Sequence, residues 1–183
     1  APRYFGKFAA RVSRIGIEPL LPMAFDFTTD VALERGVIRL NRSLLKTKES
    51  TIQVAGLAYD LFNPSSEFGV NADISLADLG TELRVPIEHK GRMKFAGRVA
   101  LQFDKRFDFQ IQGLLRGSGL GLGQKAVSID NAAVRSNIEF TRARLKLTKF
   151  EASAQGGTFT GQVSLANFRE LEAERTLANF PTA

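Results

Sequence analysis

Residues that could carry catalytic or metal chemistry are scarce in this sequence. It contains one histidine, His89, within the segment PIEHKG, and no cysteine. No second imidazole and no thiolate exist to share a metal with His89, and no nucleophile elbow suggests a Ser-His-Asp triad. We therefore expect no catalytic residue, no metal ligand and no cofactor, and we expect His89 to have a structural or solvent-exposed place in a loop.

Two other motifs offer only weak signals of ligand binding. Asp26, Thr28 and Asp30 alternate in FDFTTD, but the glycine and the terminal glutamate of a calcium loop are missing. The glycine-rich stretch GSGLGLG (117–123) follows no βα unit and has no Lys-Ser/Thr pair, so a phosphate loop is not expected there. We interpret this stretch as a flexible hairpin or loop.

The composition indicates a folded domain with a basic surface. The chain has 183 residues, 44% of them hydrophobic, and a net charge of +6 from 25 basic and 19 acidic residues. This balance favours an anionic partner, such as a phosphate surface. Nucleic acid is not the partner we expect, because proteins that bind single strands place exposed aromatic rings among their cations. Here the aromatic residues alternate with the cations and fall on the opposite parity.

Strict alternation of polar and apolar residues is the strongest pattern in the chain. In RARLKLTKFEASAQGGTFTGQVSL (142–165), basic residues alternate with Ala and Leu, and alternation resumes after the glycine pair. Successive side chains of a strand point to opposite faces, so such a segment predicts a hairpin with one apolar and one basic face. The same alternation in MKFAGRVALQF, FDFQIQGLL, STIQVAGLAYDL and SNIEF predicts roughly eight to eleven strands. The fold class is therefore mainly β, a curved and mostly antiparallel sheet over residues 1–183 as a single unit.

The basic residues at every second position of the alternating strands predict a face of the sheet that is exposed to solvent. Attraction of this face to an anionic membrane surface is the alternative. The cations that could form one stripe on it are Arg92, Lys94, Arg98, Arg142, Arg144, Lys146 and Lys149. The apolar residues at the intervening positions predict one of two arrangements. They form either the core of a sheet closed as a sandwich or barrel, or the lining of an open groove. The candidate lining residues are Phe95, Val99, Leu101, Phe103, Phe107, Phe109, Ile111, Ile138, Phe140, Leu145, Leu147, Phe159, Val163 and Leu165.

Two segments lose the two-residue period and predict one or two short helices. They are 75–82 (SLADLGTE) and 166–176 (ANFRELEAERT), and in the second Asn167 and Glu170 have the spacing of a capping box.

Glycines recur inside the predicted strands. KFAGRVAL (94–101) and TFTGQVSL (158–165) share Phe-x-Gly-x-Val-x-Leu, which places Gly97 and Gly161 at matching positions. Gly56 and Gly113 also lie in mid-strand. A glycine there marks a bulge, a bend or a close approach of another group, so we expect a strongly curved sheet and equivalent roles for Gly97 and Gly161.

Several of these segments together resemble the TamB and AsmA-like family of bacterial envelope proteins. They are STIQVAGLAYDL, FGVNADISLADL, FAGRVALQF, FDFQIQGLLRG and ARLKLTKFEASAQGGTFTGQVSLANF, spanning roughly residues 50–168. The closest match is L-x-L-x-x-F-x-A-x-x-x-G-G-x-x-x-G-x-V-x-L, from Leu145 to Leu165.

The resemblance implies a fragment of a longer, inner-membrane-anchored periplasmic protein. Its repeats would form an open, β-taco-like groove that carries phospholipid between the inner and outer membranes, without catalysis. Some members of the family are linked to assembly of outer-membrane proteins. A chaperone-like scaffold for outer-membrane β-barrel proteins, which would be a protein partner, is therefore the alternative function.

Overall fold

The residues that the structure describes form a single sheet of ten strands. The computed structural model describes residues 3–15, 23–59, 65–78, 88–103, 107–124 and 127–166. Residues 76–78 form one helical turn after the fifth strand. The strands are β1 (Tyr4–Ile15), β2 (Met23–Glu34), β3 (Val37–Lys46), β4 (Thr51–Tyr59), β5 (Ser65–Ser75), β6 (Glu88–Phe103), β7 (Phe107–Gln124), β8 (Val127–Thr141), β9 (Arg144–Ala154) and β10 (Gly157–Ala166).

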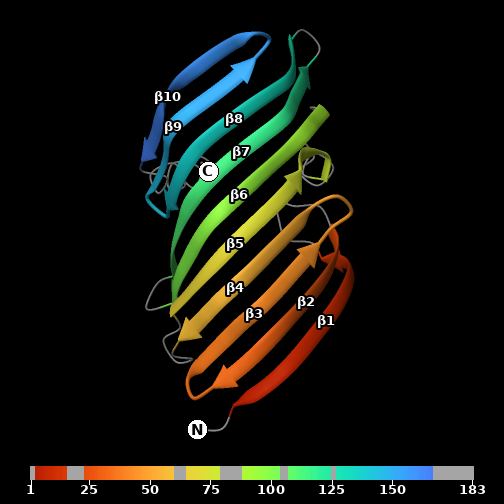
Figure 1. Ribbon diagram of the computed structural model, residues 1–183, viewed down its shortest axis with the longest axis vertical. Helices are drawn as coiled ribbons and strands as arrows, with labels where there is room; N and C mark the ends of the chain where they lie inside the picture. The colour runs from red at the N-terminus through yellow and green to blue at the C-terminus, as the bar shows by residue number, and fades with distance from the viewer. Residues whose placement is uncertain are drawn as a thin grey trace, which may run out of the picture.

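The topology is an uninterrupted antiparallel meander. Each strand pairs with the next one along the chain, so the order in the sheet is β1 to β10 (Figure 1). Strands β1 and β10 lie at opposite edges and do not pair with each other, so the sheet is open. This confirms the mainly antiparallel β fold and excludes a closed barrel for the strands that the structure describes.

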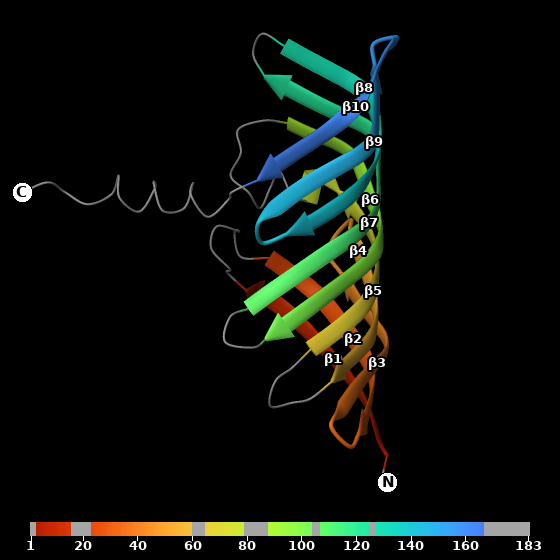
Figure 2. The same ribbon diagram turned by 90° about the vertical axis from the view of Figure 1, so that its left-hand side faces the viewer.

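The sheet is bent as well as twisted. Seen from its edge, the strands curve so that their ends lie on one side, and the sheet forms a trough (Figure 2). Seven of the nine strand pairs contain a register shift, for example between Leu40 and Ser43 in the β3–β4 pair and between Lys90 and Arg92 in the β6–β7 pair. A bulge adds a residue to one strand and increases local bending and twist. These shifts account physically for a curved sheet.

Two sequence interpretations change with the structure. The stretch 117–123 is not a loop, since it forms the C-terminal half of the 18-residue strand β7. Its glycines fit a bulged strand: Gly119 adopts a φ of 60° opposite Gly91, whose φ is 103°. His89 belongs by its backbone to β6 rather than to a loop. The predicted helix at 166–176 lies outside the described residues, apart from Ala166, which ends β10.

Register places residues of opposite character on opposite faces of the sheet. Val99 of β6 stands opposite Phe68 of β5 and Ile111 of β7, whereas its neighbour Arg98 stands opposite Gly69 and Gln112. Directly paired residues share a face, so one face is apolar and the other polar across the sheet. We call the face that carries Val99 the inner face and the face that carries Arg98 the outer face.

No second layer covers the sheet within the described residues. Ala32 is the buried hydrophobic residue there, at 2% exposure, and the other buried residues are hydroxyl residues and glycines. A closed sandwich of this size would bury many Leu, Ile, Val and Phe side chains. In the described part of the chain, the apolar side chains of the inner face therefore do not form the core of a sandwich.

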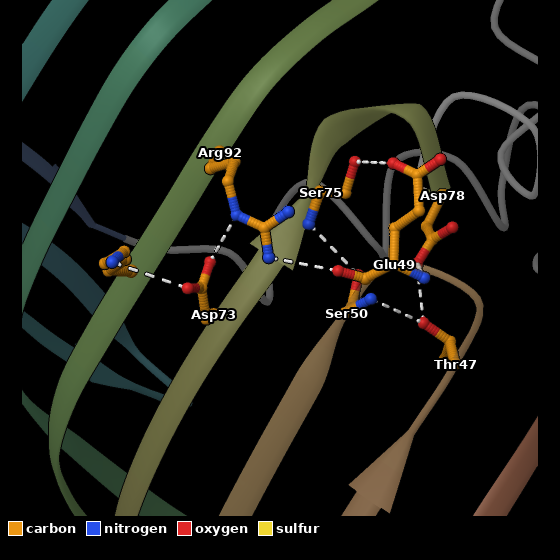
Figure 3. A network of polar contacts seen from close by, with 8 residues as sticks. Thr47, Glu49, Ser50, Asp73, Ser75, Asp78 and Arg92 are labelled. Carbon is orange, nitrogen blue, oxygen red and sulfur yellow. Dashed lines mark hydrogen bonds and ion pairs between the residues drawn. The ribbon is translucent and has the colours of Figure 1, made fainter.

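A polar cluster joins the β3–β4 connection to the helical turn after β5 (Figure 3). One carboxylate oxygen of Asp78 accepts hydrogen bonds from the hydroxyls of Thr47 (2.5 Å) and Ser50 (2.6 Å) and from the backbone amide of Glu49 (3.2 Å). Burial by itself raises the pKa of Asp78, but these hydrogen bonds together outweigh it and lower that pKa below its ordinary value. The cluster fixes the position of two connections at one end of the trough.

Replacing Asp78 by asparagine is expected to destabilise the protein by about 1–2 kcal/mol at pH 7, because the charged acceptor of several hydrogen bonds is lost. Since the folded pKa of Asp78 lies below the ordinary value of an aspartate, the ionised carboxylate stabilises the fold above that ordinary value, and this contribution disappears as the pH falls through the folded pKa. Urea denaturation at pH 7 and at pH 3 measures the difference, which should shrink at pH 3.

Asp108→Asn is the matched control for this substitution. The Asp108 carboxylate is exposed and accepts a hydrogen bond from the adjacent backbone amide of Phe109. Equal losses for the two variants would mean that the Asp78 cluster contributes no more than an ordinary surface carboxylate.

Candidate functional site: the inner face of the trough

The inner face carries continuous apolar rows that cross strand after strand. In one row Val99, Ile111, Phe140, Leu145 and Leu165 are successive Cα partners from β6 to β10. Because neighbouring strands lie about 4.8 Å apart, these side chains form a contiguous surface. The same row continues toward β1 through Phe68, Gly56, Leu40, Val31 and Gly6.

All fourteen residues chosen from the sequence lie on this face. The strand register arranges them in a few rows across the sheet. In a second row, for example, the successive Cα partners from β6 to β10 are Gly97, Gly113, Ile138, Leu147 and Val163. Those on β6 to β9 are mostly half-buried, whereas Phe103 and Phe107 at the strand ends and the β10 residues are exposed. The structure thus unites these residues into one surface, and a lipid-binding role for it remains a prediction.

The apolar face lies on the concave side of the trough. Phe95, Val99 and Ile111 are half-buried although no second layer of described residues covers them, whereas the intervening Lys94 and Arg98 are exposed. Side chains on a concave surface converge and shield one another, and those on a convex surface diverge into solvent. The exposure pattern therefore indicates that the apolar side chains line the inside of the bend.

Aromatic rings follow one another along the rim of β6 to β8. The ring centroids of Phe103 and Phe107 lie 4.9 Å apart, those of Phe107 and Phe109 5.9 Å apart, and Phe109 meets Phe140 edge-on at 5.1 Å. Such offset and edge-to-face pairs are favourable beyond simple burial. They give this end of the inner face an ordered aromatic border.

Mid-strand glycines allow aromatic rings to approach the backbone closely on the inner face. A Cβ added at Gly97 would come within 2.6 Å of the Phe95 ring, and one at Gly113 within 2.7 Å of the same ring. A Cβ at Gly56 would come within 2.8 Å of the Phe68 ring. The close approach predicted for these glycines is therefore confirmed, and the group that approaches is an aromatic side chain together with the neighbouring strand.

Gly161 does not share this role, although its sequence context matches that of Gly97. The nearest atoms to a Cβ built there belong to the Phe159 ring, at 3.4 and 3.5 Å, which is ordinary van der Waals contact. Gly161 lies in the edge strand β10, so it has one neighbouring strand, β9, where Gly97 has two. The predicted equivalence of the two glycines is wrong for this physical reason.

Strands β1 to β5 provide a half of the inner face that the alternation pattern had not indicated. Residues that belong to it include Phe8, Phe27, Leu45, Ile52, Val54, Phe68 and Val70. A bulge at residues 41–42 of β3, present in both the β2–β3 and the β3–β4 pair, reverses the parity of β3 and weakens its alternation. The inner face there also carries a hydroxyl pair, Thr29 and Ser43, which is buried and joined by a 2.6 Å hydrogen bond. The regular alternation of β4, in TIQVAGLAY, was the signal that could have extended the face.

Other kinds of site find little support in the described residues. Those residues contain no group of three or more His, Asp or Glu placed to hold a metal ion. Nor do they contain a helix of the length and apolarity needed to cross a membrane.

Comparison of the chain with protein-family models, with curated proteins and with solved structures gives no match in any of the three. The resemblance to the TamB and AsmA-like family therefore remains a prediction.

Proposed function

We propose that the inner face of the trough binds the acyl chains of phospholipid and that the protein is a non-enzymatic conduit for lipid. The observation that carries this proposal is a mainly apolar face, ten strands wide and with only a few hydroxyl side chains, that no second layer of described residues covers. Large apolar side chains on it remain accessible, among them Val163 at 38% and Phe159 at 63% exposure. Exposed apolar patches larger than a few hundred Å² mark binding surfaces.

The dimensions suit lipid tails. Ten strands at about 4.8 Å spacing make the inner face roughly 43 Å wide across the strands. An acyl chain spans about half of a ~30 Å hydrocarbon core, so several chains fit side by side or in succession. The exposed charges of the outer face keep the opposite surface in water. Following the family resemblance, we place this conduit in the periplasm, between an inner and an outer membrane.

A photo-crosslinking amino acid tests the proposal directly. At Phe109 or Val163, both on the inner face, we expect crosslinks to phospholipid in cells, identified by mass spectrometry of the organic extract. The same amino acid at Gln112, which is exposed on the outer face, is the matched control and should give none. Equal lipid crosslinking from both faces, or none from either, would contradict the proposal.

Val163→Glu separates binding from folding. Val163 lies on the edge strand and is 38% exposed, so a carboxylate there should cost little stability. We expect the variant to keep its circular dichroism spectrum and to lose most of the lipid that copurifies with the wild-type protein. Unchanged lipid content in a folded variant would exclude this part of the inner face as a lipid path.

A scaffold for outer-membrane β-barrel proteins is the second candidate, and the edge strand β10 favours it. Residues 157–166 contain no charge and no proline and are all exposed, whereas edge strands usually carry such protection against pairing. An extended segment of a partner could add to this edge. Saturable binding of unfolded β-strand peptides, together with inner-face crosslinks to protein alone, would support the scaffold over the conduit.

A further inference from the structure

Three cations stand side by side on the outer face, on three adjacent strands. Lys94 of β6 is the Cα partner of Arg116 of β7, and Arg116 is the Cα partner of Arg135 of β8. Like charges that face each other directly across strands destabilise a sheet. The sequence did not indicate this row, because residues 94, 116 and 135 share no local pattern, and Lys94 was expected in a different stripe.

Counter-charges within the sheet do not balance this row. Asp73 lies 3.4 Å from the Lys94 ammonium, but it also accepts a 2.8 Å hydrogen bond from Arg92, which lowers the pKa of Asp73. Among the described residues, no carboxylate forms an ion pair with Arg116 or Arg135, although Glu151 is the Cα partner of Arg135. Positive charge therefore remains in excess around Arg116.

A hollow adjoins the row. It has a volume of about 420 Å³, and its lining includes Lys94, Arg116, the amide residues Gln53 and Asn71, and Asp73, whose carboxylate pairs with Arg92 and Lys94. Ala96 lies among them and leaves space because its side chain is small. An ammonium, a guanidinium and primary amides are all hydrogen-bond donors, and the two cations are the side chains that proteins use to bind phosphate.

We infer that this hollow is a binding site for a phosphate group, with Lys94 and Arg116 as its charged ligands and Arg135 as the flanking cation. The ligand is a phosphate ester or a diphosphate, either soluble or displayed as the headgroup of an anionic lipid. The site lies on the face opposite the proposed lipid path, so it does not depend on the proposed function.

Calorimetric titration with pyrophosphate, at physiological ionic strength, tests the soluble source. Sedimentation with vesicles that contain phosphatidylglycerol tests the lipid source. We expect saturable binding in at least one of these assays and a loss of at least about tenfold in affinity for Arg116→Gln, because the substitution removes one of the two charged ligands of the phosphate. Binding should also shift the NMR signals of the Gln53 and Asn71 side-chain amides.

Arg98→Gln is the matched control. Arg98 is an exposed outer-face cation that pairs with Glu67 at 3.5 Å and does not line the hollow, so its replacement should leave the affinity unchanged. Without ligand, Arg116→Gln should keep or raise the melting temperature, because it removes a repulsion between like charges. Absence of binding in both assays, or equal losses for Arg98→Gln and Arg116→Gln, would overturn the inference.

Discussion

Gly97→Val is expected to destabilise the protein by about 3 kcal/mol, at the upper end of the usual cost of overpacking. A Cβ at this position would strike the backbone carbonyl oxygen of Gln112 and come within 2.7 Å of the Cα of Gly113. Backbone atoms of a central strand pair cannot move aside as a flexible side chain does. The Phe95 ring, 2.6 Å from the same point, would also lose its place on the floor of the inner face. Urea denaturation followed by circular dichroism measures the loss.

Gly161→Val is the matched substitution, because the two glycines share the sequence Phe-x-Gly-x-Val-x-Leu. Here the Phe159 ring, at 3.4 Å, is the nearest group, and valine suits an extended strand. We expect a change below about 1 kcal/mol. A similar large loss for both variants would show that the repeated motif, rather than the contacts around Gly97, determines the need for glycine.

Leu147→Asp is expected to cost about 2–3 kcal/mol, since a carboxylate without a partner would replace an apolar side chain on the inner face. Leu147 is half-buried and has Ile138 and Val163 as its Cα partners on the neighbouring strands. Neither neighbour offers a hydrogen bond or a positive charge. Thermal melting followed by circular dichroism should show a clearly lowered midpoint.

Arg144→Ala, on a residue nearby in the same strand, provides the comparison. Arg144 is exposed and pairs with Glu139 at 3.0 Å, and ion pairs at a surface contribute about 0–1 kcal/mol. Its melting temperature should therefore stay close to that of the wild-type protein. Equal effects of the two substitutions would mean that the assignment of residues to inner and outer faces is incorrect.

The two faces of the later strands could be predicted because they depend on a local rule. Side chains alternate along any extended strand, so the parity of Leu145, Leu147, Val163 and Leu165 follows from the sequence once a strand is assumed. The hairpin between β9 and β10 is equally local: Gln155 and Gly156 adopt φ values of 49° and 80°, as a tight two-residue turn requires. Where a bulge breaks the alternation, at residues 41–42 of β3, the same rule failed.

The glycine-rich stretch 117–123 illustrates a different limit. Glycine weakens both strands and helices, so its composition indicated a loop. In the structure it pairs with β6 on one side and β8 on the other, and its bulges lie opposite Gly91. Pairing with two neighbours supplies hydrogen bonds that the local sequence does not encode.

The sequence by itself determined that the chain alternates, that it forms strands, and which residues of the later strands share an apolar face. Only the tertiary structure decided that the sheet stays open, that Gly97 differs from Gly161, and that Lys94, Arg116 and Arg135 form one row. The physical reason is that openness depends on the twist and register shifts accumulated over nine strand pairs, and neighbours across strands depend on pairing between residues about 20 positions apart. Alternation has a period of two residues and carries no information on either.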